Sequence, residues 1–142
     1  MTATTTLPIV KEVLLDASPS RVWSALTDKN EMKQWYFDLK EFKPEVGFEF
    51  DFTVEHEGRK WVHLCRVTEA VPNKKLSYTW RYEGIAGDSL LTFELIPEGA
   101  KTRLRLTHSG LETFPTDIPG LEVENFNVGW GHFIESIKKY LS

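Results

Sequence analysis

Apolar and polar residues alternate through most of the middle of the chain, from Phe48 to His108. A period of two places every second side chain on the same face, which is typical of a β-strand with one buried side. Short turn-forming segments, such as residues 55–60, interrupt the alternation. The pattern therefore predicts five consecutive antiparallel strands, over residues 48–54, 61–71, 76–82, 89–96 and 102–108.

Before this region, residues 9–17 show the same alternation and predict a further strand. Two short helices are expected to follow it, because each has a residue whose side chain can accept a hydrogen bond from the free N–H groups of a first helical turn. Ser18 stands before Pro19, which suits the first helical position. Asp28 stands three residues before Glu31, the spacing of a capping box, in which each side chain satisfies a backbone N–H of the other residue.

After residue 122 the apolar period changes to the spacing of a helix. Residues at this spacing form one stripe between residues 123 and 141: Phe126, Trp130, Phe133, Ile134, Ile137 and Leu141. Gly129 and Gly131 are costly inside a helix and suggest a close backbone approach, or room left beside Trp130. Because a one-sided antiparallel sheet needs a cover, we expect this long helix to lie across the apolar face. The predicted fold class is α+β.

Composition narrows the range of partners. The chain has 142 residues, a net charge of −4 and a sequence pI of about 5.6, which disfavours nucleic acid because its binding rewards a basic face. No run of about 18 apolar residues suggests a membrane span. Residues 1–8 resemble a Thr-rich tail and lack the pattern of a signal peptide. Cys65 is the only cysteine, so no internal disulfide can form, and we expect a cytoplasmic protein.

The whole pattern resembles a known family. The segments "DASPSRVWSALTDKNEMKQW", "VTEAVPNKKLSYTW" and "GWGHFIESIKKYL" are similar to those of proteins related to the C-terminal domain of the heat-shock protein 90 ATPase activator, in the START-like (SRPBCC) superfamily. The resemblance runs from about Ile9 to Leu141. It implies a helix-grip fold, in which a curved antiparallel sheet wraps around a long C-terminal helix and two short helices follow the first strand.

The resemblance also implies an elongated, largely apolar cavity between the sheet and the C-terminal helix. Members of the superfamily bind lipids, sterols, polyketides or other hydrophobic molecules, and a few are cyclases or hydrolases. We expect residues 1–142 to form one such domain, with no room for the separate N-terminal chaperone-binding domain of the eukaryotic co-chaperone. Co-chaperone activity is therefore not carried over from the family.

Two histidines and a cysteine are the candidate metal ligands. His63, Cys65 and His108 share the inward side of their predicted strands, but the strands of the two histidines are three steps apart in a meander. Three steps of about 4.8 Å separate them by roughly 14 Å, whereas zinc holds its ligands at about 2.0–2.3 Å. We therefore predict no metal site and no cofactor, and we expect Cys65 to be a small buried residue.

His108 ends its predicted strand just before the turn "SGLETFP". We expect its ring to hydrogen-bond a backbone carbonyl of that turn and to anchor the loop at the rim of the cavity. Two alternatives stay open: contact with a ligand head group, and general-base catalysis. Glu69 shares the parity of Cys65, but we expect it to be solvated near the following turn rather than to act as a buried general acid.

We predict that the protein binds a small hydrophobic or aromatic molecule and that it is not an enzyme. The apolar wall would supply affinity, and His63, His108 and Tyr78 would orient the ligand. The residues predicted to line the cavity are Trp35, Phe37, Phe50, His63, Tyr78, Trp80, Phe93, His108, Trp130 and Phe133. The segments 42–47 and 110–121 are candidates to gate access.

Two other classes of function stay open. A stress-related, chaperone-associated module, which could also form a homodimer, would act through an exposed apolar patch and would need no internal void. An enzyme of the cyclase or hydrolase kind would use a pocket His or Tyr as acid and base, and would show a strongly shifted pKa on a cavity group. The volume of the cavity and the polar atoms inside it distinguish the three classes.

Overall fold

The computed structural model describes residues 8–56 and 58–142. Its elements are β1 (Ile9–Leu15), α1 (Pro19–Thr27), α2 (Lys29–Trp35), β2 (Glu49–His56), β3 (Arg59–Val71), β4 (Lys75–Tyr82), β5 (Ser89–Glu98), β6 (Lys101–Ser109), the 3-10 turn η1 (Leu111–Thr113) and α3 (Val123–Tyr140). Each predicted strand and helix occurs, so the α+β class is confirmed. The predicted tail 1–8 and the predicted loop 55–60 each lie partly outside the described residues.

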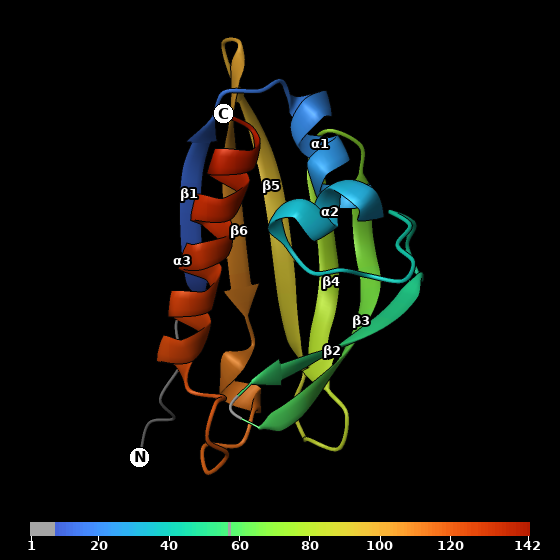
Figure 1. Ribbon diagram of the computed structural model, residues 1–142, viewed down its shortest axis with the longest axis vertical. Helices are drawn as coiled ribbons and strands as arrows, with labels where there is room; N and C mark the ends of the chain where they lie inside the picture. The colour runs from blue at the N-terminus through green and yellow to red at the C-terminus, as the bar shows by residue number, and fades with distance from the viewer. Residues whose placement is uncertain (1–7, 57) are drawn as a thin grey trace.

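The strands form one antiparallel sheet in the order β1-β6-β5-β4-β3-β2. The meander from β2 to β6 follows the chain, but β1 returns to pair with β6, with Ile9 opposite His108 and Leu15 opposite Thr102. A bulge between Val67 and Glu69 shifts the pairing of β3 with β4. The sheet therefore curves along its length and leaves β1 and β2 as its two edges (Figure 1).

The three helices cover the apolar face of the sheet. α3 runs along β1 and β6, and α1 and α2 lie beside it across the upper part of the sheet (Figure 1). The buried residues of α3 are Trp130, Ile134 and Ile137, which belong to the predicted stripe. This arrangement is the helix-grip fold that the sequence predicts. No helix within the described part of the chain is long and apolar enough to span a membrane.

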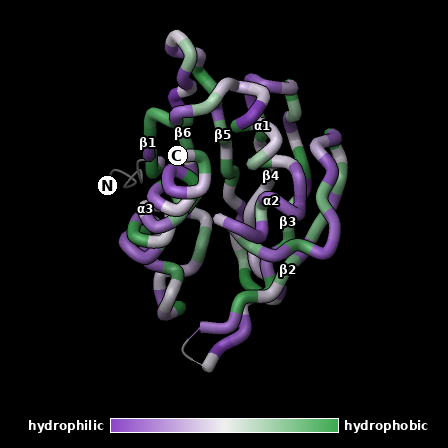
Figure 2. Tube along the Cα trace, turned by 45° about the horizontal axis from the view of Figure 1, so that its top comes forward, coloured by the Kyte–Doolittle hydropathy of each residue, from purple (hydrophilic) through white to green (hydrophobic). Residues whose placement is uncertain are grey.

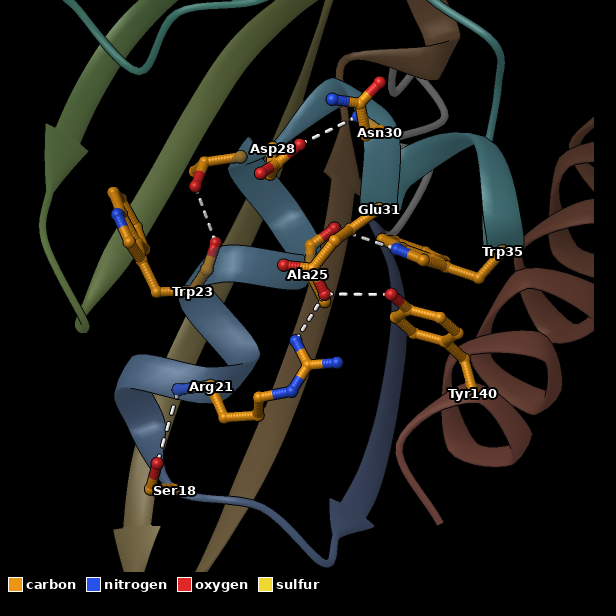
Figure 3. Close-up of polar contacts among 10 residues, drawn as sticks. Ser18, Arg21, Trp23, Ala25, Asp28, Asn30, Glu31, Trp35 and Tyr140 are labelled. Atoms are coloured by element: carbon orange, nitrogen blue, oxygen red, sulfur yellow. Dashed lines mark hydrogen bonds and ion pairs between the residues drawn. The ribbon is translucent and has the colours of Figure 1, made fainter.

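Both short helices begin at the predicted caps (Figure 3). The Ser18 hydroxyl oxygen accepts a hydrogen bond from the backbone N–H of Arg21 at 3.3 Å. A carboxylate oxygen of Asp28 accepts one from the backbone N–H of Asn30 at 2.8 Å. These bonds satisfy N–H groups that have no partner inside the helix, and they place α1 and α2 end to end above the sheet.

The reciprocal half of the predicted capping box is wrong. The backbone N–H of Asp28 bonds to the carbonyl of Ser24 at 2.9 Å, because Asp28 also ends α1. The Glu31 carboxylate is therefore free to accept hydrogen bonds from the guanidinium of Arg21 and, at 2.9 Å, from the hydroxyl of Tyr140 (Figure 3). One carboxylate thus joins α1 and α2 to the C-terminal end of α3.

The outer face of the sheet is charged and solvated, as the alternation predicts. The side chain of Arg105 donates to the Glu12 carboxylate at 2.6 Å, and that of Arg103 donates to Glu98 at 2.5 Å. Glu69 is 45% exposed in its side chain and lies 3.2 Å from the Lys75 ammonium, which confirms that it is solvated. These pairs add little stability, and they leave the inner face as the place for a site.

Candidate ligand pocket

An aromatic plug fills the middle of the space between the sheet and α3. Tyr36, directly after α2, places its hydroxyl 2.7 Å from the hydroxyl of Tyr78. Burial raises the pKa of both phenols well above the usual value, so both stay neutral. The ring of Tyr36 packs with centroid distances of 4.6 to 6.4 Å against Trp35, Phe37, Phe93, Trp130 and Phe133. Sequence reasoning named both chain neighbours of Tyr36 but missed Tyr36 itself.

A pocket of about 470 Å³ remains beside this plug, between the N-terminal half of α3 and strands β2 to β4. Aromatic side chains and backbone of the loop before α3 make most of its wall. Its lining residues are Phe37, Val54, His56, Trp61, His63, Trp80, Tyr82, Gly120, Leu121, Asn125, Phe126, Val128, Gly129, Trp130, His132 and Phe133. At one end of the pocket the β2–β3 hairpin approaches the loop before α3, where the ring of Trp61 lies beside Gly120.

The structure divides the ten predicted lining residues into two groups. Five of them line the pocket: Phe37, His63, Trp80, Trp130 and Phe133. The other five are buried in the core outside the pocket: Trp35, Phe50, Tyr78, Phe93 and His108. A binding role for either group stays a prediction. Trp61 and Tyr82 were recognised from the alternation as inward residues, but their place in the pocket wall was missed.

His63 is held in one neutral form in the wall of the pocket. Its Nδ1 lies 2.9 Å from the backbone carbonyl of Trp61, so Nδ1 carries the proton and Nε2 keeps a lone pair. The ring stacks on Phe52 at a centroid distance of 4.4 Å. Burial lowers the pKa of His63 to about 4, against the opposing effect of backbone carbonyls. The imidazole is therefore a neutral acceptor near pH 7.

His108 is the centre of a buried hydrogen-bond chain. The indole N–H of Trp130 donates to Nδ1 of His108 at 2.9 Å, so the imidazole proton lies on Nε2, which is 2.8 Å from the Ser89 hydroxyl. That hydroxyl donates to the backbone carbonyl of Trp80 at 2.6 Å. The expected bond to a carbonyl of the following turn is therefore wrong. His108 does act as an anchor, but for α3 against the sheet.

The two histidines cannot share a metal ion. His63 lies on β3 and His108 on β6, and strands β4 and β5 stand between them in the sheet. Within the described ranges no three His, Cys, Asp or Glu residues are placed to hold a metal. Cys65 is buried, and burial raises the pKa of its thiol, so it behaves as an apolar core residue.

Glycines shape the pocket at two places. An added Cβ at Gly129 would meet no atom within 4 Å, and the same holds for Gly131. The alternative of a close backbone approach is therefore wrong for both, and the first of them leaves room in the pocket beside Trp130. At Gly120, by contrast, a Cβ would lie 2.7 Å from the Trp61 ring, and φ is +101°. Gly120 thus permits the close packing of the loop on Trp61.

Replacement of Gly120 by alanine is expected to lower the free energy of unfolding by about 1–3 kcal/mol. Both the positive φ and the contact with Trp61 oppose a side chain there. Gly99→Ala is the matched control, because Gly99 also has a positive φ but has open space around it. Urea unfolding of the two variants measures the difference. Equal losses in both would show that the Trp61 contact does not matter.

The sequence matches the family model described as "Activator of Hsp90 ATPase homolog 1-like protein" over residues 16–142. The chain belongs to this family. No curated protein matches the chain. The family match begins directly after β1, covers all three helices and the remaining strands, and so includes every pocket residue.

Solved structures similar to this family member share its fold. Protein MLL2253 from Mesorhizobium loti is 30% identical, with 94% of this chain and 96% of that chain covered and a TM-score of 0.75. CalU16 from Micromonospora echinospora is 27% identical, with 95% and 76% covered and a TM-score of 0.72. The Aha1 dimer from Colwellia psychrerythraea is 23% identical, with 96% of each chain covered and a TM-score of 0.69, and supports the fold alone.

In this family member polar residues lie beside the pocket. A second hollow adjoins the first and shares His56, Trp61, Gly120 and Asn125 with it. The guanidinium of Arg59 lies over the Trp61 ring, 4.3 Å from its centroid, in a cation–π contact. Hydrophilic positions gather at this end of the β2–β3 hairpin (Figure 2). The largely apolar pocket thus adjoins a more polar hollow.

Proposed function

We propose that this protein binds a small, largely apolar or aromatic molecule in the pocket under α3. The observation that carries the proposal is the pocket itself, with a volume of about 470 Å³ and a mainly aromatic wall. Small-molecule sites usually have volumes of about 300–1,000 Å³ and apolar walls with a few polar groups. A densely packed core would have left no space of this size.

The wall is preorganised, which favours binding. Trp80 and Trp130 pack edge to face with centroids 5.1 Å apart, and each indole N–H is bonded, to Tyr82 and to His108 respectively. A ligand therefore does not have to order these side chains, which would otherwise cost about 0.5–1.5 kcal/mol for each flexible side chain. Its buried apolar area would contribute about 25 cal/mol per Å².

Of the three residues nominated to orient the ligand, we assign the role to His63. It lines the pocket, whereas the hydroxyl of Tyr78 bonds to Tyr36 and both ring nitrogens of His108 bond within the core. For access we favour the segment 110–121, because it contributes residues 120 and 121 to the wall. The segment 42–47 contributes none.

The structure favours binding over the other two classes of function. The most exposed large apolar side chains of the described residues are Val46 at 70%, Val10 at 50% and Val128 at 50%, and they lie on three different segments. A chaperone-docking patch or a homodimer thus stays a hypothesis. For a catalytic base, an orienting partner that favours the charged imidazole is needed, whereas the surroundings of His63 favour the neutral form.

Five tryptophans make the binding proposal testable by NMR. On addition of 2-naphthol, the indole N–H signals of Trp61, Trp80 and Trp130 are expected to shift, because these residues line the pocket. Those of Trp23 and Trp35, which do not line it, are expected to stay. Native mass spectrometry of freshly purified protein would also measure the mass of any natural ligand that stays bound.

A matched pair of helix variants serves as the control. Gly129→Leu places a side chain at the pocket wall, whereas Gly131→Leu adds the same side chain outside the pocket, and at both positions an added Cβ meets no atom within 4 Å. We expect the first variant to weaken binding of 2-naphthol about tenfold or more and the second to leave it unchanged. Equal affinity in both variants, or no shift of the three pocket signals, would reject the proposed function.

A further inference from the structure

Most polar atoms deep in the pocket wall are already engaged within the protein. The indole N–H of Trp130 donates to His108, and that of Trp80 donates to the Tyr82 oxygen at 2.9 Å. The Nδ1–H group of His63 faces a backbone carbonyl. These three N–H groups are therefore already bonded and cannot donate to a ligand.

Two polar atoms on neighbouring rings can each form one further hydrogen bond. Tyr82 accepts a hydrogen bond through its oxygen, but the described residues offer no acceptor for its own O–H. The lone pair on Nε2 of His63 likewise meets no donor among them. The two rings lie 4.8 Å apart at 62°, and both residues line the pocket and are only 5% exposed.

The position of these atoms follows from their burial. Every fully buried side-chain nitrogen and oxygen in the described part of the chain has a hydrogen-bond partner. Since Nε2 of His63 has none, it must reach the surface of the pocket rather than sit sealed in the core. The pocket wall thus includes one donor and one acceptor on two adjacent rings.

We propose that the ligand of this pocket carries a neutral hydroxyl group, phenolic or alcoholic, which binds between Tyr82 and His63. The inference rests on the proposed function and specifies its ligand. The O–H of Tyr82 donates to the ligand oxygen, and the ligand O–H donates to Nε2 of His63. Each bond has the usual O–H···O or O–H···N character, at about 2.8 Å, and no proton is transferred.

The protonation states of the two residues disfavour a charged ligand. Burial lowers the pKa of His63 to about 4 and raises that of the Tyr82 phenol, so both are neutral near pH 7. The lone pair of a neutral imidazole repels a carboxylate oxygen, and removal of a carboxylate from water into an aromatic pocket is costly. A ligand without a hydroxyl, in turn, covers both groups and leaves them unpaired.

Four compounds of nearly the same shape test the inference: 2-naphthol, 2-methoxynaphthalene, naphthalene and 2-naphthoate. The first can donate and accept, the second can only accept, the third can do neither, and the fourth is an anion. We expect 2-naphthol to bind about three- to tenfold more tightly than 2-methoxynaphthalene, the gain from one further net hydrogen bond, and 2-naphthoate to bind most weakly. Dissociation constants are measured from the indole N–H shifts.

Two variants assign the preference to the named atoms. In His63→Asn the amide nitrogen can replace Nδ1, but the acceptor Nε2 is deleted, and in Tyr82→Phe the donor is deleted. His63→Asn is expected to reduce the ratio of the 2-naphthol and 2-methoxynaphthalene affinities toward one. Tyr82→Phe is expected to reduce the ratio of the 2-methoxynaphthalene and naphthalene affinities toward one, because both compounds with an oxygen accept from the Tyr82 O–H. Tyr140→Phe, which deletes a hydroxyl outside the pocket, is the control and should keep both ratios. Because both affinities in a ratio are measured with the same variant, a change in the stability of that variant does not alter the ratio.

The possible failures are distinguishable. If naphthalene, 2-methoxynaphthalene and 2-naphthol bind with equal affinity, the hydroxyl inference is overturned while the binding function stands. The inference is also overturned if the preference for 2-naphthol over 2-methoxynaphthalene survives in His63→Asn, or if 2-methoxynaphthalene keeps an advantage over naphthalene in Tyr82→Phe. If none of the four compounds shifts the pocket signals of the unaltered protein, the proposed function fails, and the hydroxyl inference fails with it.

Discussion

A decrease in pH from 7 to 5 is expected to lower the free energy of unfolding by about 4 kcal/mol. The cause is the burial of two neutral histidines. Burial lowers the pKa of His63 to about 4 and that of His108 to about 3, whereas an unfolded histidine titrates near 6.5. Each residue therefore contributes about 2 kcal/mol to the change over this range.

The sign of the change follows from proton uptake. Between pH 6.5 and the folded pKa values, the unfolded chain binds a proton at each histidine and the folded protein does not. Acid therefore favours the unfolded state, and stability rises with pH through this window. The folded protein resists protonation of His108 because burial disfavours the charged imidazole, and protonation would also remove the acceptor of the Trp130 N–H.

Urea unfolding at several pH values measures the effect. His108→Leu removes one of the two groups and is expected to reduce the slope between pH 6 and 5 by about half. It also leaves the Trp130 N–H and the Ser89 hydroxyl without their partner, so only the slope, and not the absolute stability, is compared. His132→Gln, at an exposed position, is the control. An unchanged slope in His108→Leu would contradict the explanation.

Truncation of the aromatic plug, Tyr36→Ala, is expected to cost about 3–5 kcal/mol of unfolding free energy. The ring of Tyr36 contacts aromatic side chains from the segment after α2, from β5 and from α3, and the space that it leaves cannot close without moving all three. Chemical denaturation measures the loss. A loss below about 1 kcal/mol would mean that α3 closes the space.

The hydroxyl pair at this plug can be tested separately. Tyr36→Phe leaves the Tyr78 hydroxyl unpaired in the core and is expected to cost about 1–3 kcal/mol. The double variant Tyr36→Phe/Tyr78→Phe removes both hydroxyls and should cost less than the sum of the single variants, because no buried partner is left over. Strict additivity would show that the two hydroxyls do not depend on each other.

Local signals in the sequence were sufficient to predict the elements of the fold. The alternation from Phe48 to His108 predicted the strands, because a period of two is a property of the strand itself. Ser18 and Asp28 marked the starts of α1 and α2, because a cap acts on N–H groups only two or three residues away. Such signals depend only on neighbours along the chain, so they can be recognised without knowledge of the fold.

Contacts between distant segments were not accessible in this way. The pairing of Ile9 with His108 places the first strand on the far edge of the sheet, and nothing in either segment specifies the other. Glu31 has the right spacing for a capping box, but its carboxylate bonds to Arg21 and to Tyr140 on α3. The spacing rule for a capping box fails here because tertiary packing places other donors next to the carboxylate.

The same limit applies to the pocket. The sequence by itself determined which side chains point inward, because the strand period fixes the side of the sheet that each one takes. It did not determine that Tyr36 fills one part of the interior while Tyr82 faces open space in another. Only the tertiary structure decided that, because the gap between an inward ring and α3 depends on the curvature of the sheet and on where the helix is anchored by distant contacts.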